Sequence, residues 1–205
     1  MISIRHPDPE QVRKLVDRVA QSPFSYSHVG RTRNTPPEGF NVDRYSIELG
    51  VGDEVWAAAK SAINNWVPFR LSWIKSYPQG EPEPDVAVAV VARILGFWWV
   101  NISRVVYTID EADLFGFAYG TLGYHAEIGE ECFMIQRDPN TGTVTYSILA
   151  FSKPGHVLAR LGYPLSRAAQ RRFGAGSLKA MFDAIETHLL PGTLRESQRT
   201  VPPCE

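Results

Sequence analysis

The sequence predicts an α+β fold in which one curved antiparallel sheet of about seven strands wraps around a long C-terminal helix. First, residues 86–152 form a run of segments rich in β-branched and aromatic residues, separated by turn-forming residues. Second, residues 165–189 place apolar side chains at helical spacing. Third, no helical pattern interrupts the strand run. Its strands are therefore expected to pair antiparallel, and the last helix is the element long enough to cover one face of the sheet.

The size and charge of the chain narrow the function classes. In a chain of 205 residues, we expect one domain over residues 1–190 and an extended or disordered tail over 191–205. The net charge of −1 argues against nucleic acid as a partner, because phosphate binding needs a basic surface. The apolar stretch 86–100 contains Arg93 and is too short for a membrane span.

The start of the chain and its cysteines predict a cytoplasmic protein. Residues 1–14 carry charges and lack the apolar stretch of a secretion signal. Cys132 and Cys204 lie far apart without metal-ligand spacing, as in a reducing compartment. Nucleotide-binding glycine motifs are absent as well, so we expect no cofactor. Whether the chain forms a homodimer stays open.

Two helices and two strands are expected in the first half of the chain. Asp8 is the expected N-cap of the first helix, and Asp53 is the expected N-cap of the second, which Pro68 ends. The loop after the first helix contains many Ser, Pro, Gly and Asn residues among aromatic ones, so we expect it to be ordered. The expected segments are helix 8–20, loop 22–40, strand 40–50, helix 52–69 and strand 70–77.

The second half combines successive strands with the long helix. Gly96 is expected at a bulge or bend between the first two strands. Gly174 and Gly176 each weaken the helix by roughly 1 kcal/mol relative to Ala, so we expect them where helix and sheet approach closely. The helix is expected over 153–190 with a break at 162–164. The expected strands are 86–100, 101–111, 114–125, 130–138 and 142–152, the last two forming a hairpin.

Five segments resemble a family of bacterial and plant proteins known only as a domain of unknown function. They are "SYSHVGRT", "PPEGF", "LGVGDEVWAAAKSAINNW", "YGTLGYHAEIGEECFMI" and "YPLSRAAQRRF", and the resemblance extends from about Phe24 to Ile185. The element order is similar to that of the superfamily of START domains, birch-pollen allergens and polyketide cyclases (SRPBCC), whose fold is the helix-grip. This resemblance implies a cavity for an apolar small molecule. The extra N-terminal helix and loop depart from the superfamily's usual plan.

The expected pocket lies between sheet and helix, and aromatic side chains commonly line such pockets. Large aromatic residues are more often simple core residues, and that alternative stays open for each of them. The candidate ligand-binding residues are Tyr26, Trp66, Trp99, Tyr107, Tyr119 and Arg167.

The candidate catalytic residues are His125, Glu127 and Glu131. His125 and Glu127 are two positions apart, so on a strand both face the same side, and a histidine beside a carboxylate can transfer protons near neutral pH. Two other interpretations stay open. The surrounding glycines favour a solvated turn at the rim of the sheet, and a His-x-Glu spacing is a weak metal signal. Because the other histidines show no paired spacing, we expect no metal.

Arg167, Gln170 and Arg171 share one face of the long helix. If that face meets the sheet, Arg167 needs a carboxylate partner, and Glu127 or Glu131 is available for that role. The other interpretation is a solvated outward stripe, which is favoured because arginine is rarely buried.

The predicted function is binding of a small apolar or aromatic metabolite of lipid, isoprenoid or polyketide type. The alternative is a metal-free enzyme that uses the same pocket for cyclisation, dehydration or hydrolysis. In that enzyme, His125 and a glutamate would transfer protons, while Tyr26, Tyr119 or Arg167 would hold a polar substrate atom. An interaction domain without a pocket is a third hypothesis, because the fold does not decide the function.

Overall fold

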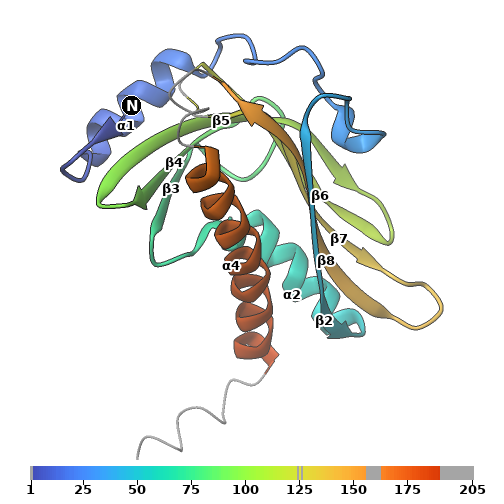
Figure 1. Ribbon diagram of the computed structural model, residues 1–205. Helices are drawn as coiled ribbons and strands as arrows, with labels where there is room; N and C mark the ends of the chain where they lie inside the picture. Colours follow the sequence, from blue (N-terminus) through green and yellow to red (C-terminus); the bar gives the residue numbers. More distant parts are fainter. Residues whose placement is uncertain (1, 124, 126, 156–162, 190–205) are drawn as a thin grey trace, which may run out of the picture.

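A single antiparallel sheet forms the frame of the molecule (Figure 1). The computed structural model describes residues 2–123, 125, 127–155 and 163–189. In those ranges, seven strands run in the order β2-β8-β7-β6-β5-β4-β3, and a short eighth strand, β1, pairs with β5. The strands are β1 (Ile2–Ser3), β2 (Asn41–Val51), β3 (Ile74–Pro78), β4 (Ala87–Ile94), β5 (Phe97–Asp110), β6 (Leu114–Thr121), β7 (Glu127–Arg137) and β8 (Thr143–Pro154).

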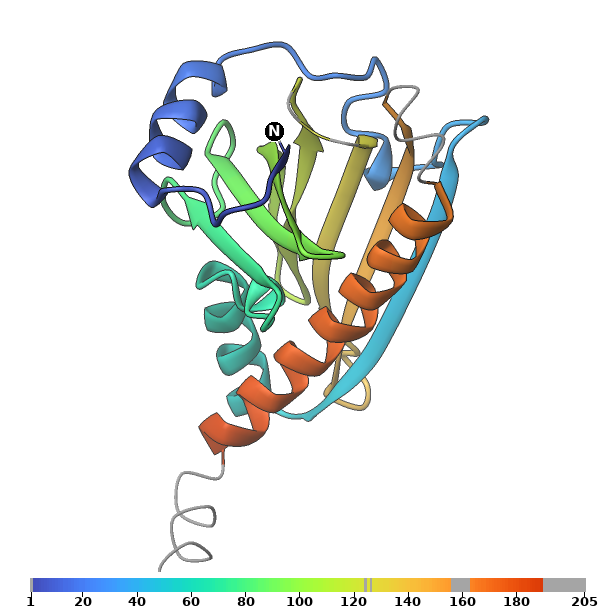
Figure 2. The ribbon, with the colours of Figure 1, turned by 60° about the vertical axis from the view of Figure 1, so that its left-hand side comes forward.

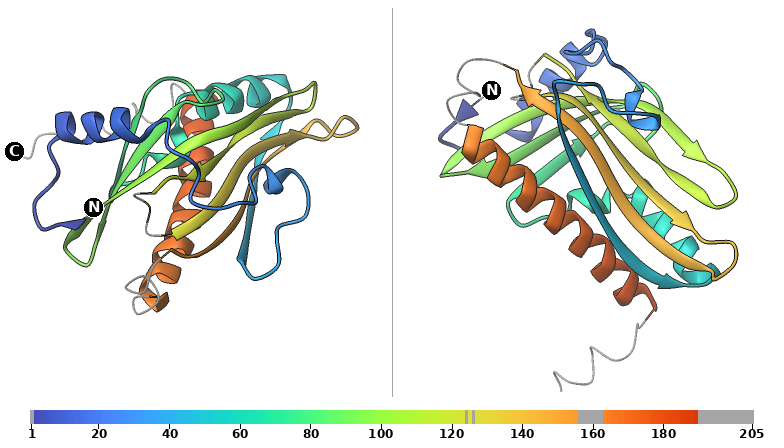
Figure 3. Two further views of the ribbon diagram at one scale, coloured as in Figure 1. Left: turned by 90° about the horizontal axis from the view of Figure 1, so that it is seen from above. Right: turned by 45° about the vertical axis from the view of Figure 1, so that its right-hand side comes forward.

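The concave face of the sheet holds the main core. Helix α2 (Asp53–Asn64), the short 3-10 helix η2 (Val67–Phe69) and the long helix α4 (Tyr163–Leu189) all pack on this face. Figure 1 shows the sheet arching over α4, and the right-hand view of Figure 3 shows the same curvature from another side. Met181 and Ile185 of α4 are fully buried against it. The chain therefore has the predicted helix-grip fold.

The outer face of the sheet carries a second core beneath the N-terminal helix α1 (Pro9–Val19). Asp8 caps this helix as predicted, accepting a hydrogen bond from the amide of Glu10. The left-hand view of Figure 3 shows α1 and α4 on opposite sides of the sheet. Because strand residues alternate between faces, β4 serves both cores. The second core contains Val12, Val16, Val19, Ala87, Ala89, Val91, Val100 and Ile102.

The ends of several predicted helices and strands differ from those in the structure. Helix α2 starts at Asp53 itself, and Gly52 precedes it without a side-chain cap, because the Asp53 carboxylate pairs with Arg137 instead. The predicted bend at Gly96 is confirmed, because the chain turns at 95–96, whereas the predicted boundary between residues 100 and 101 is wrong, because β5 runs on without interruption. Strand β1 was not predicted, because a strand of two residues is too short to show an alternating pattern. The predicted helix start at Lys153 is wrong, because β8 runs to Pro154, while residues 156–162 and the predicted tail 191–205 lie outside the described residues.

Gly174 is a point of close approach between α4 and the sheet. A Cβ atom built there would lie 2.5 Å from the ring of Tyr45 on β2, whereas one built at Gly176 would meet the flexible side chain of Leu71 at 3.2 Å. Next to this contact, the Tyr146 and Ser177 hydroxyls are hydrogen-bonded at 2.8 Å. The predicted close approach of helix and sheet is therefore confirmed at Gly174.

We expect Gly174→Ala to destabilise the protein by about 1–3 kcal/mol, because overpacking against Tyr45 outweighs the gain in helix propensity. Gly176→Ala is the matched control, and we expect it to be neutral or stabilising by up to about 1 kcal/mol. Urea denaturation of both variants measures the difference. Equal effects of the two substitutions would contradict the close contact.

Candidate functional site

A cavity of about 230 Å³ lies between the concave sheet and the N-terminal half of α4. The buried residues of α4 begin at Gly174, whereas the preceding turns contact the sheet through polar bonds to β2 and β8, and the cavity lies beside these turns. Its wall is mainly aliphatic and aromatic. The apolar lining residues include Phe69, Trp73, Ile74, Val90, Ile94, Trp99, Leu165, Ala169 and Phe173.

The lower end of the cavity is closed by packed aromatic rings. Phe69 contacts the rings of Tyr119, Phe133 and Phe173, with centroid distances of 5.1–5.8 Å. Such tilted ring pairs fix one another's orientation and leave little room for water. The polar groups of the site therefore lie above a dry floor.

Glu131 and Tyr119 form the polar centre of the cavity. They are direct neighbours on β7 and β6, and the Tyr119 hydroxyl donates a hydrogen bond to Glu131 Oε2 at 2.8 Å. Burial raises the pKa of the Glu131 carboxyl from 4.5 to about 7, against the lowering effect of the Tyr119 hydrogen bond. Near neutral pH, a large share of this carboxyl is protonated and can donate a hydrogen bond to a ligand.

His125 and Glu127 precede Glu131 in the chain, and both also line the cavity. The amide of Glu127 donates to Nδ1 of His125 at 3.1 Å, so the neutral ring carries its proton on Nε2. Burial lowers the pKa of His125 from 6.5 to about 4. The imidazole is therefore neutral at physiological pH.

The three candidate catalytic residues share the cavity but form two separate groups. Glu127 and Glu131 are four residues apart on β7, which is roughly 13 Å of extended strand. His125 lies beyond Glu127, so it is out of hydrogen-bond reach of Glu131. A ligand large enough to span the cavity can contact both groups. A single reacting atom cannot lie within reach of both.

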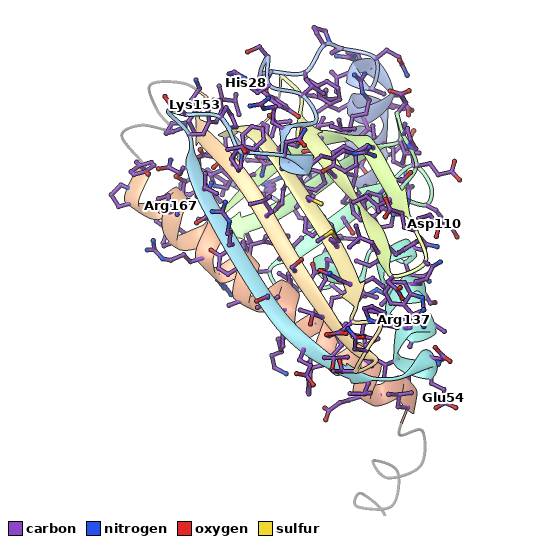
Figure 4. All side chains as sticks on the ribbon, turned by 90° about the vertical axis from the view of Figure 1, so that its right-hand side faces the viewer. His28, Glu54, Asp110, Arg137, Lys153 and Arg167 are labelled. Atoms are coloured by element: carbon purple, nitrogen blue, oxygen red, sulfur yellow. The ribbon has the colours of Figure 1, made fainter. Side chains whose placement is uncertain are left out.

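Arg167 lies at the rim of the cavity, where α4 meets β2 (Figure 4). Its guanidinium forms two hydrogen bonds of 2.6 Å with the carboxylate of Asp43 and a third with Gln170. Asp43 and Gln170 line the cavity. The proposed partners Glu127 and Glu131 were wrong, because β2 rather than β7 faces this turn of the helix. The favoured outward orientation holds for Arg171, which is exposed, but not for Arg167.

Comparison with known proteins places the chain in a family. A family model described as "Domain of unknown function (DUF1990)" matches residues 25–180. The chain belongs to the DUF1990 family. The UPF0548 protein of Dictyostelium discoideum is 32% identical over 207 residues, covering 90% of this chain and 96% of the relative. The UPF0548 protein of Arabidopsis thaliana is 33% identical over 201 residues, covering 90% and 97%.

Solved structures share the fold of this DUF1990 protein. An aromatase/cyclase of Streptomyces sp. R1128 superposes with a TM-score of 0.54 at 13% identity, over 73% of this chain and 96% of the other. Norcoclaurine synthase of Thalictrum flavum gives 0.51 at 10% identity, over 73% and 96%. At such low identities, the likeness establishes the fold alone.

Three predicted ligand-binding residues of the DUF1990 chain lie away from the cavity. Trp66 is in the core and donates from its indole to the carbonyl of Gly80. Tyr26 and Tyr107 lie on the outer face, because β5 has a bulge before Tyr107 and the loop carrying Tyr26 crosses that face. Trp99 and Tyr119 do line the cavity.

On the outer face, the buried carboxylate of Glu130 holds the N-terminal loop. It accepts hydrogen bonds from the Tyr26 hydroxyl and the Gly30 amide, both at 2.6 Å, and from the amide and hydroxyl of Thr32. Tyr107 joins this network through the Thr32 hydroxyl at 2.7 Å. Burial raises the pKa of the Tyr26 and Tyr107 hydroxyls above their usual range, so both stay neutral. In the fold, Tyr26 and Tyr107 therefore help to hold this loop against the outer face of the sheet.

The cavity also contains residues that the sequence did not single out as a site. They are Asp43, Tyr45, Trp73 and Asn101. In the sequence, polar residues at every second position of an edge strand such as β2 indicate a polar face. They do not indicate whether that face meets solvent or a cavity. Only the position of α4 distinguishes the two cases.

The described residues contain neither a candidate metal-ligand cluster nor a membrane-spanning helix. Within the described ranges, no three His, Cys, Asp or Glu side chains lie together as metal ligands would. Among the helices of the same ranges, none is both long and apolar enough to cross a membrane.

Glu131 makes a pH-dependent contribution to stability that a glutamine lacks. Because its folded-state pKa is raised, the folded protein loses stability as pH rises from about 4.5 to about 7, by up to about 3 kcal/mol. We therefore expect the stability of Glu131→Gln relative to wild type to increase across this window. The opposite contribution of His125 is common to both proteins and cancels.

Thermal melts at a series of pH values measure this difference. Glu48→Gln, on an exposed position of β2, is the matched control and should run parallel to wild type. A constant offset between Glu131→Gln and wild type would contradict the raised pKa.

Proposed function

We propose that this DUF1990 protein binds a small, mostly apolar molecule that carries at least one hydrogen-bond acceptor. The observation that supports this most is the composition of the cavity wall. Aromatic and aliphatic side chains surround a few placed polar groups, chiefly Glu131 with Tyr119 and His125 with Glu127, above a floor closed by rings. Specific small-molecule sites combine an apolar lining with a few placed polar groups in this way.

The size of the cavity limits the ligand. A volume of about 230 Å³ is below the 300–1,000 Å³ that is usual for drug-sized ligands. We therefore expect a molecule of two or three fused rings, or a short isoprenoid, rather than a lipid with two acyl chains. The protonated form of Glu131 favours a carbonyl, hydroxyl or ether oxygen on the ligand over a carboxylate, because an ionised Glu131 would repel an anion.

Ala169 and Ala168 offer a matched pair of variants that test the cavity. Ala169 lines the cavity, whereas its neighbour Ala168 is exposed on the same helix. We expect Ala169→Phe to fill the space and to weaken binding of the uncharged fluorescent probe N-phenyl-1-naphthylamine at least about tenfold. Ala168→Phe should bind the probe as wild type does.

Native mass spectrometry of freshly purified protein completes this test. A co-purifying compound should be present in wild type and Ala168→Phe, and absent from Ala169→Phe. Trp73 and Trp99 line the cavity, so quenching of intrinsic fluorescence should accompany binding. Equal probe affinity in all three proteins, with no co-purifying compound, would overturn the proposal.

The second candidate function is an acid/base enzyme on the same cavity. It is favoured by two opposite pKa shifts, which leave Glu131 able to donate a proton and His125 able to accept one near neutral pH. Because the two groups are far apart, each would act on a different atom of the substrate. Cyclisation, dehydration and hydrolysis all include proton transfers of this kind.

Substitution of the two groups separates catalysis from binding. If the co-purifying compound is a substrate or product, we expect His125→Ala and Glu131→Gln each to slow its conversion by about 100-fold or more while affinity changes little. Conversion followed by mass spectrometry gives the rate, and probe fluorescence gives the affinity. Unchanged rates in both variants would leave binding as the function.

A further inference from the structure

The turn between β4 and β5 places a leucine where neither backbone preference nor packing accounts for it. The two turn residues, Leu95 and Gly96, have φ values of 49° and 82°, as in the two-residue hairpins that favour Asn-Gly. A branched apolar residue is strained in this left-handed region. The Leu95 side chain is also 75% exposed, so it gains no stability from the core.

Two more exposed apolar side chains belong to the same tip. β1 pairs antiparallel with β5, with Ser3 opposite Trp98, so Ile4 follows next to Phe97. Ile4 is 78% exposed and Phe97 is 46% exposed. We call Ile4, Leu95 and Phe97 the hairpin-tip patch. Figure 2 shows the N-terminal segment beside this hairpin, on the side of the molecule where α4 is also in view. Single exposed apolar residues are ordinary, but a group at a protruding tip marks a contact surface.

The chain segments around this tip are basic. Residues 2–7, 66–79, 86–109 and 163–182 contain no Asp or Glu, although the whole chain has a net charge of −1. Exposed Arg93 lies over the Trp98 ring at 5.7 Å, and exposed Arg172 lies over the Trp73 ring at 4.5 Å. Arg5 follows Ile4 and is exposed as well. The nearest acidic residue along the N-terminal segment is Asp8.

We propose that the hairpin-tip patch docks this protein onto the surface of an anionic lipid bilayer. The three apolar side chains enter the boundary between headgroups and acyl chains, and the surrounding arginines face lipid phosphates and carboxylates. Tryptophan rings are favoured at the boundary between water and lipid, and Trp98, which follows Phe97 in the chain, provides such a ring.

A second copy of the chain fits the patch less well. Stable dimers bury about 800 Å² per partner, which is far more than three side chains supply. In a symmetric dimer the same patch would meet itself, so the arginines of both copies would repel one another. An anionic bilayer instead attracts every one of them.

The docking surface continues into the cavity wall. Ile94 precedes Leu95 directly and lines the cavity, as do Trp73 and Trp99 on the adjoining segments. This continuity, which rests on the proposed binding function, gives an apolar ligand a path between bilayer and cavity. Docking itself does not depend on an occupied cavity, so vesicle binding and cavity binding are tested separately.

Vesicle sedimentation tests the docking. We expect wild type to bind phosphatidylcholine vesicles containing about 30% phosphatidylserine, and binding to weaken between about 0.05 M and about 0.5 M NaCl. Pure phosphatidylcholine vesicles should bind much less. Leu95→Asn creates the preferred Asn-Gly turn, so it should raise or keep the melting temperature while weakening vesicle binding about tenfold.

Two further variants complete the design. Adding Phe97→Thr to Leu95→Asn should abolish measurable binding. Val51→Thr is the control, because Val51 is 58% exposed at the end of β2, and three strands (β8, β7 and β6) separate β2 from β5 in the sheet. Failure of wild type to bind anionic vesicles, or equal binding by Leu95→Asn and wild type, would overturn the proposal. So would a dimer, seen by light scattering, that Leu95→Asn dissociates without any vesicle binding.

Discussion

The contact between α4 and the sheet at Gly174 is the constraint on which the rest of the structure depends. Below it, Ser177, Met181 and Ile185 are buried in the main core. In the N-terminal half of the helix, polar bonds to β2 and β8 replace this core packing, and the cavity lies between this half and the sheet. A glycine at this point lets the helix rest directly on the ring of Tyr45, so the angle between helix and sheet is fixed by backbone proximity. The cavity therefore arises from the shape of the fold rather than from missing side chains.

Burial in this space determines the chemistry of the polar residues that face it. Desolvation disfavours charge in either direction, so it raises the pKa of Glu131 and lowers the pKa of His125. Near physiological pH, His125 is then neutral and a large share of Glu131 is protonated, which eases their burial and suits them to an uncharged ligand. The charged pair at the rim, Arg167 with Asp43, is instead stabilised by direct bidentate contact and lies where solvent reaches it. The Arg167–Asp43 ion pair thus lies at the mouth, whereas His125 and Glu131 face the interior.

The fold could be predicted from the sequence because apolar residues follow regular strand and helix spacings over long segments. The uninterrupted strand run and the apolar face of residues 165–189 allowed one arrangement of sheet and helix, and the capped helix at Asp8 was found by its Asp-Pro start. The site was predicted less completely. Trp99 and Tyr119 were placed correctly, whereas Tyr26 and Tyr107 lie on the other face. A bulge before Tyr107 reverses the alternation that the sequence implies, and no local signal marks that bulge. Asp43 became a site residue only through the position of α4.

Glu130 and Glu131 show why residue type alone cannot assign a role. They are adjacent on β7, so their side chains leave the strand on opposite faces. Outside, Glu130 accepts hydrogen bonds from Tyr26, Gly30 and Thr32, and these donors occupy both of its oxygens. Inside, Glu131 accepts the Tyr119 hydroxyl on one oxygen and faces the cavity. The first carboxylate is committed to holding a loop, and the second keeps hydrogen-bonding capacity for a ligand. Since one strand fixes both, the outer clamp also fixes the position of the polar centre of the cavity.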